Sequence, residues 1–187
     1  MTKDNNFNLN FSIIYLWFII NRILYFEEGL LSNIDRIDQK IIFFLQKDGR
    51  LTNFDLAEKV GLSPSPCLRR VKSLEQKGLI AGYTAIIDEV SYGYPVTAFV
   101  SVRLENQTDQ ILKSFEKEIT SLDAVMDCWL VTGNRDYLLR VVASDLKNYE
   151  IFMREELTKV KGIASIETNF ALGRVKTKNN LPYKLII

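Results

Sequence analysis

The stretch LAEKVGLSPSPCLRRVKSLEQKG, residues 56–78, decides the fold of the first half of the chain. A serine cap at Ser63, followed by proline at the first helical position, predicts that a helix begins at Pro64. Gly78 ends this helix, and Gly61 ends a shorter helix before it. Two short helices joined by a tight turn that contains glycine are typical of a helix-turn-helix motif.

Two helices are predicted upstream of this turn. Asp35 and Asp38 suit the N-terminus of the first, and Gly49 follows its end. Thr52 caps the second, with Asp55 three residues later in the capping-box position. The apolar residues at helical spacing in these two helices are Ile34, Ile37, Ile41, Ile42 and Leu45, then Leu56, Ala57 and Val60.

The third helix combines an apolar face with a face of basic and small residues. A thiol at the inward edge, as Cys67 would be, behaves as a small apolar residue. Any small bundle could present arginines on a solvated face, so this pattern favours DNA binding and leaves the simpler bundle open. The inward residues are Cys67 or Leu68, Val71 and Leu74, and the outward residues are Ser65, Pro66, Arg69, Arg70, Lys72, Ser73 and Gln76.

Composition excludes several classes of catalyst. The 187 residues include no histidine, so the chain cannot build a Ser-His-Asp relay, a Cys-His relay or an H-E-x-x-H zinc site. Cys67 and Cys128 are too few for a four-sulfur zinc site, and no secretory signal is visible, so they indicate free thiols in a reducing compartment. We therefore expect a cytoplasmic protein without a metal or cofactor.

Charge is distributed unevenly along the chain. The whole sequence has 24 Lys and Arg against 23 Asp and Glu, a net charge of +1. Residues 33–84 hold nine basic and six acidic side chains, a net +3, whereas residues 1–32 and 85–187 are each at −1. The predicted helix-turn-helix is therefore the basic segment, although attraction to DNA depends on clustering on one face rather than on the sum.

The second half predicts an α+β domain. Residues 96–105 place small apolar side chains at every second position, as a strand with one buried face does. The order strand-helix-strand-strand-helix-strand is the split, ferredoxin-like arrangement, with both helices on one side of an antiparallel sheet. The predicted strands are residues 96–105, 124–132, 137–143 and 163–172, and the helices run from about 108 to 122 and from 145 to 162.

The opposite face of that sheet is too apolar to remain in water. Phe99 and Trp129, with parts of Val125 and Val131, are predicted to lie on it. The natural cover is the same face of a second subunit, stacked about a two-fold axis. We therefore expect a homo-oligomer.

Residues 1–32 do not share the pattern of the rest. The apolar run FSIIYLWFII, residues 11–20, is only half as long as the roughly 20 residues that a transmembrane helix needs. Three interpretations stay open: a helix that docks on this protein or a partner, a weak membrane anchor, or translated sequence upstream of the true start. The regular pattern begins at Asn33, and there is no methionine between Met1 and Met126. We expect no membrane-spanning segment.

Several stretches together resemble the Lrp/AsnC (leucine-responsive/asparagine regulator) family of transcription factors. They are NIDRIDQKII, LQKDGR, the segment from LAEKVG to AIID, and VTGNRDYLLRV, and the resemblance runs from about Asn33 to about Val175. It implies a winged-helix-like helix-turn-helix domain over residues 33–84, a linking strand at 79–87, and a ferredoxin-like effector-binding and oligomerisation domain over residues 88–187. It also implies dimers that assemble further.

The resemblance assigns roles to particular residues. The third helix would lie in the major groove of double-stranded DNA, with Ser63 at its start, Ser65, Pro66, Arg69 and Ser73 near base edges, and Arg70 and Lys72 on phosphates.

An amino-acid effector would bind near the Gly-x-x-Asp-Tyr turn, which contains Gly133, Asn134, Asp136 and Tyr137. The Asp136 carboxylate would accept the effector's ammonium group or, alternatively, only support the turn. The competing function is a metabolite-binding subunit or enzyme accessory protein that does not bind DNA. No residue of the sequence is assigned a catalytic role.

Overall fold

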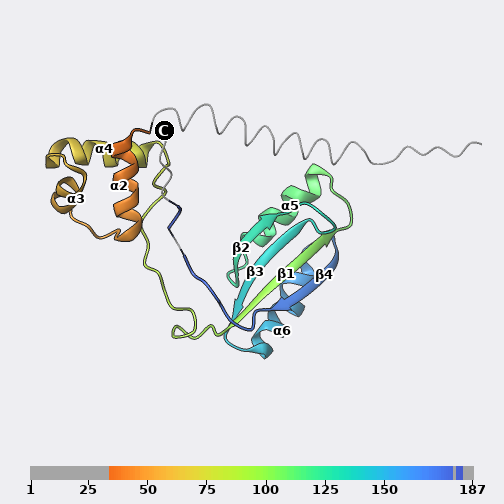
Figure 1. The fold of residues 1–187 in the computed structure, drawn as a ribbon. Coiled ribbons are helices and arrows are strands. Elements are labelled where there is room, and N and C mark those ends of the chain that lie inside the picture. The colour runs from red at the N-terminus through yellow and green to blue at the C-terminus, as the bar shows by residue number, and fades with distance from the viewer. Residues whose placement is uncertain (1–33, 179, 183–187) are drawn as a thin grey trace, which may run out of the picture. The chain divides into compact units, whose positions relative to one another are not determined.

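The computed structural model describes residues 34–178 and 180–182 (Figure 1). The described residues form two compact units. The first comprises residues 34–84, 178 and 180–182, and the second is Ala85–Thr177. The predictions about residues 1–32 lie outside the described residues.

The N-terminal unit is built from three helices. They are α2 (Arg36–Lys47), α3 (Asn53–Val60) and α4 (Pro64–Gln76). Their apolar faces meet in one core, as the spacing of the apolar residues predicts. The buried members of that core are Ile41, Leu56, Ala57, Val60, Cys67 and Leu74.

Local capping explains where α2 and α3 begin. The Asp35 carboxylate accepts hydrogen bonds from the backbone N–H groups of Ile37 and Asp38, both at 2.9 Å. The Thr52 hydroxyl accepts from the Asp55 backbone N–H at 3.2 Å and donates to the Asp55 carboxylate at 2.6 Å. These contacts satisfy N–H groups that a helix start leaves unpaired, so both predicted starts are confirmed.

The cap of α4 differs from those of α2 and α3. Ser63 occupies the N-cap position, but its side chain makes no capping hydrogen bond. The preferred donors for such a cap are the backbone N–H groups of the second and third helical residues. The third of these residues is Pro66, which has no N–H. Ser63 is therefore the N-cap residue by position, without a side-chain hydrogen bond, and the helix begins at Pro64 as predicted.

The expected linking strand is also absent from the described structure. Residues 79–88 form no strand, and most of this segment is exposed, Ile86 at 75%. A strand needs a second strand to accept and donate its backbone hydrogen bonds, and the described chain places none beside this segment. The described part of the N-terminal unit therefore consists of helices without a strand.

The second unit is a four-stranded antiparallel sheet with two helices. The strand order β2-β3-β1-β4 is the ferredoxin-like one. The side chains that the two helices bury share one core with the inner face of the sheet, so both helices cover the same face (Figure 1). The elements are β1 (Val96–Leu104), α5 (Asp109–Ile119), β2 (Val125–Leu130), β3 (Tyr137–Ala143), α6 (Leu146–Glu155), the 3-10 helix η2 (Leu157–Lys159) and β4 (Ile163–Phe170).

One boundary in this unit was predicted wrongly. Helix α6 does not continue to residue 162, because Glu156 leaves the helical region and η2 follows. Lys178 and residues 180–182 group with the N-terminal unit, where the Leu181 backbone N–H donates to Gln46 of α2 at 2.7 Å. The expected extent of the second domain, residues 88–187, stays a prediction.

A β-bulge changes which residues lie on the outer face of the sheet. Val125 pairs with Val141 and Asp127 with Arg140, so one extra residue sits in β2. Val125 consequently packs against the inner core, and its predicted place on the outer face was wrong. Phe99 and Trp129 remain exposed, at 37% and 45%.

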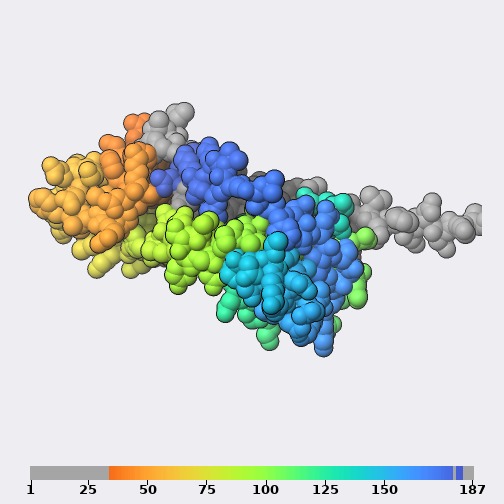
Figure 2. Space-filling model, turned by 90° about the horizontal axis from the view of Figure 1, so that it is seen from below, coloured from red at the N-terminus to blue at the C-terminus, as the bar shows by residue number. Residues whose placement is uncertain are grey.

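An ion-pair network joins the segment that precedes β1 to the segment that follows β4. Arg140 on β3 binds Asp127 at 2.6 Å and Glu89 at 2.8 Å, and Glu89 also binds Arg174 at 2.9 Å. Figure 2 shows the green segment before β1 beside the blue segment after β4, which this network joins.

Candidate DNA-binding face and effector loop

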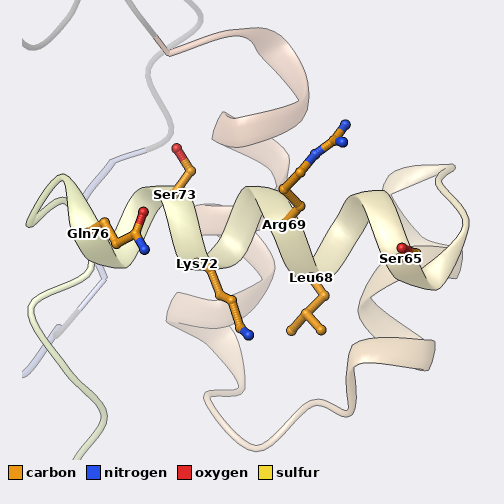
Figure 3. Close-up of a pocket in the computed structure, with 6 residues that line it drawn as sticks. All are labelled: Ser65, Leu68, Arg69, Lys72, Ser73 and Gln76. Carbon is orange, nitrogen blue, oxygen red and sulfur yellow. The ribbon is translucent and has the colours of Figure 1, made fainter.

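The outward face of α4 forms a shallow cavity of about 360 Å³. Its lining residues recur three or four positions apart, which places them on one face of the helix. Figure 3 shows Arg69 and Ser73 on one side of the helix axis and Leu68 and Lys72 on the other. The residues that line the cavity are Ser65, Leu68, Arg69, Lys72, Ser73 and Gln76.

Two of these residues carry unneutralised positive charge. Arg69 and Lys72 are exposed, and neither forms an ion pair with any described residue. Unpaired basic groups on one helix face attract polyanions. This face is therefore suited to DNA phosphates and base edges.

Arg70 faces in a different direction from the one that the sequence predicted. Its guanidinium binds the carboxylates of Asp35 at 2.7 Å and Asp38 at 2.8 Å, and its side chain is only 32% exposed. The hydrogen bonds that the guanidinium donates to Asp38 and Asp35 raise the pKa of Arg70. Arg70 therefore joins α4 to the start of α2, and its outward orientation was predicted wrongly.

Three of the remaining predicted DNA-binding residues, Ser63, Ser65 and Pro66, lie around the first turn of α4, and Ser73 lies near its C-terminal end. Ser63 and Ser65 are exposed, whereas Pro66 and Ser73 are half-buried. Sequence reasoning left Leu68 undecided between the two faces and did not propose Gln76 as a contact. Complete burial of Cys67 settles the choice, because it places Leu68 outside, 44% exposed.

The predicted effector residues separate into two environments. Gly133 and Asn134 are exposed in the loop between β2 and β3. Gly133 has φ +123°, a conformation that residues with a Cβ rarely adopt, and an added Cβ would meet nothing within 4 Å. Arg135 anchors this loop to β4, since its guanidinium binds Glu167 at 2.6 Å and the Ser165 hydroxyl at 3.1 Å.

Asp136 and Tyr137 point into the unit. Asp136 is 7% exposed, and its carboxylate accepts from the Leu104 backbone N–H at 2.7 Å and from the Gln107 side-chain amide at 2.5 Å. Tyr137 is 1% exposed and donates to Glu116 at 2.9 Å. These contacts are those of turn support, one of the two predicted roles of Asp136. Its role toward an effector stays a prediction.

The described residues offer little for other kinds of chemistry. Among them, no group of three or more His, Cys, Asp or Glu side chains could hold a metal ion. No described helix is long and apolar enough to cross a membrane. Burial raises the pKa of Cys67, and burial and the charge of Glu116 raise the pKa of Cys128 to about 11, so both sulfurs are protonated near neutral pH.

Two family models match the chain over its two units. A model of winged helix-turn-helix DNA-binding domains matches residues 34–81, and a model of the Lrp/AsnC ligand binding domain matches residues 97–181. The leucine-responsive regulatory protein of Rhizobium meliloti is 43% identical over 76% of this chain and 92% of its own length. The Bkd operon transcriptional regulator of Pseudomonas aeruginosa is 45% identical over 81% of this chain and 99% of its own.

Solved structures give the same result. A transcriptional regulator from Neisseria meningitidis in complex with L-methionine superposes with a TM-score of 0.77 at 33% identity, over 83% of this chain and 100% of that one. An AsnC family regulator from Agrobacterium tumefaciens has a TM-score of 0.76 at 36% identity, over 82% and 99% of the two chains. These relatives are transcriptional regulators rather than enzymes. The chain accordingly belongs to the Lrp/AsnC family of DNA-binding transcriptional regulators.

Proposed function

We propose that this regulator recognises specific DNA sequences by placing α4 in the major groove. The face of α4 that lines the cavity would then point toward the bases. One observation carries the proposal: two basic side chains on an exposed helix face, Arg69 and Lys72, form no ion pair with any described residue. The second helix of a helix-turn-helix presents its N-terminal residues to base edges in this manner.

Individual contacts follow from chemistry and position. Arg69 reads a base edge, since a guanidinium can donate two parallel hydrogen bonds to guanine. Lys72 binds a phosphate, and Ser65 and Ser73 supply hydroxyl groups to bases or the backbone. Ser63 meets a phosphate at the N-terminus of α4, where unpaired N–H groups favour an anion. Arg70 is excluded from this set, because it neutralises Asp35 and Asp38.

An amino acid acts as effector in this proposal. The related regulator from Neisseria meningitidis was solved with L-methionine, and the second unit matches a ligand binding domain. The effector contacts the exposed loop at Gly133 and Asn134, while Asp136 and Tyr137 hold that loop in place through their internal hydrogen bonds.

A homo-oligomer completes the regulator. Phe99 and Trp129 remain exposed on the outer face of the sheet, and burial of such a face against its copy gives an isologous dimer. We place the protein in the cytoplasm, because its proposed DNA target lies there and because free thiols persist in a reducing compartment.

Single substitutions on α4 test the DNA-binding proposal. Arg69→Ala is expected to cost about 1–3 kcal/mol and to relax preference at one base pair. Lys72→Ala is expected to weaken all sequences together and to reduce the salt slope by about 1. Fluorescence anisotropy with a selected operator and a random duplex separates the two effects. Equal losses on both DNAs for both variants would remove Arg69 from base readout.

A further inference from the structure

Leu68 is an apolar side chain outside the core, on a face that is otherwise polar. It is 44% exposed, whereas the preceding Cys67 is completely buried. Val71, one turn later, packs against the core of the N-terminal unit, and Leu68 is not among the residues that do. A single exposed leucine needs no explanation by itself. This one, however, lines the same cavity as Arg69 and Lys72.

The position of Leu68 along α4 puts it within reach of bases. Leu68 is the fifth residue of α4 (Pro64–Gln76) and lies in its N-terminal half, the part that a recognition helix brings to base edges. Its side chain projects on the same side as Lys72 and away from Arg69 (Figure 3). A phosphate held by Lys72 and a base read by Arg69 would leave Leu68 facing a neighbouring base pair.

Resting on the DNA-binding function above, we propose that Leu68 recognises the 5-methyl group of a thymine in the major groove. That methyl is the apolar group among the four base edges there, and leucine has neither donor nor acceptor for the others. Facing the amino group of cytosine or adenine instead, Leu68 would leave a donor without a partner, which is unfavourable. Leu68 therefore specifies an A·T pair beside the pair that Arg69 reads.

Replacement of thymine by uracil tests this inference directly, because uracil lacks only the methyl group. The full chain is first used to select an operator from random duplexes, and each thymine is then replaced singly. At one thymine in each site bound by α4, affinity is expected to fall about fourfold, the factor that burial of one methyl group is worth. At the other thymines, affinity is expected to change by less than about 1.5-fold, since no contacted methyl is lost there.

Leu68→Ala assigns the effect to this side chain. The variant is expected to melt like the unaltered chain, because Leu68 lies outside the core, and to bind the thymine and uracil operators equally. Leu146→Ala, the same change at a 62% exposed leucine of α6, should retain the fourfold difference. Leu68→Gln serves as a second variant and should also lose it.

The possible outcomes distinguish thymine recognition by Leu68 from the proposed DNA-binding function on which it rests. A selected operator that no uracil weakens, or a fourfold difference that survives both Leu68 variants, would overturn thymine recognition by Leu68 and leave DNA binding intact. Failure to select any DNA would instead remove the proposed function.

Discussion

Arg70 Nη1 lies 2.8 Å from Asp38 Oδ1, and this ion pair joins the recognition helix to the first helix of its unit. The Asp38 side chain is only 11% exposed, so its charge depends on Arg70 for compensation. Adjacent arginines on α4 therefore differ: Arg70 binds carboxylates of its own unit, whereas Arg69 forms no ion pair with a described residue and is the one proposed to contact DNA.

Arg70→Ala should lower the free energy of unfolding of the N-terminal unit by about 1–2 kcal/mol, since Asp38 loses its partner. Arg69→Ala should leave this free energy within about 0.5 kcal/mol, as expected for an exposed residue that forms no ion pair with a described residue. Urea unfolding of both variants checks the contrast. The assignment fails if Arg69→Ala is the more destabilising change.

Acid should weaken the same unit through Asp35. Burial acts to raise the pKa of Asp35, but the backbone N–H of Asp38 and the Arg70 guanidinium lower it below its usual 3.8. A pKa that is lower in the folded state contributes stability above the unfolded value, and this contribution is lost as pH falls through the folded value. The melting temperature of wild type minus that of Asp35→Asn should therefore be constant near neutral pH and should shrink below pH 3.8.

Asparagine remains a good helix cap, so Asp35→Asn isolates the charge. A difference that grew on acidification would show that the charge of Asp35 destabilises the fold.

Asp136→Ala should cost about 1–3 kcal/mol, because it leaves the buried Leu104 N–H and the Gln107 amide without their acceptor. Asn134→Ala should leave stability within about 0.5 kcal/mol, since Asn134 is exposed. Thermal melts measure the loss of stability in Asp136→Ala. Calorimetry with the twenty amino acids measures effector binding, which should be weaker in Asn134→Ala than in the unaltered chain. Normal melting of Asp136→Ala with loss of amino-acid binding would instead make Asp136 an effector ligand.

Trp129→Glu should prevent association of the sheets, since it puts a charge on the face proposed to meet its copy. Light scattering should then report monomers. Leu146→Glu provides the control. Leu146 is an exposed residue of α6, and α6 packs on the face of the sheet opposite to the one that carries Trp129. An unchanged mass for Trp129→Glu would exclude this face as the interface.

Cys128 should react slowly with alkylating reagents despite its exposure. With a pKa of about 11, little thiolate is present at pH 8, and the rate should be on the order of tenfold below that of free cysteine. Glu116→Gln removes a negative charge and should shift the pH–rate profile to lower pH. A profile identical to that of free cysteine would contradict the raised pKa.

Local signals were sufficient for most of the fold. The caps at Asp35, Thr52 and Asp145 each act within three residues, so the sequence alone located these helix starts. Strict alternation in β1 likewise predicted its buried face, because the strand period is two.

Relationships between distant residues could not be predicted in this way. Asp136 and Gln107 are 29 residues apart, and Arg70 and Asp38 are 32 apart. No periodicity links such pairs, so Arg70 was predicted to face outward toward DNA phosphates, and the role of Asp136 stayed open between an effector contact and support of the turn. The bulge in β2 similarly reversed the face of Val125, because one added residue changes the side on which every earlier residue of the strand lies.

The most direct test of the account is a salt titration of DNA affinity for the full chain. If Arg69, Lys72 and their neighbours on α4 contact DNA, the logarithm of the association constant should fall linearly with the logarithm of salt concentration, with a slope of about −0.9 per phosphate contacted. A selected operator should bind at least about a thousandfold more tightly than a random duplex at the same salt. An affinity that is independent of salt, or equal for both duplexes, would contradict a sequence-specific regulator that reads DNA through α4.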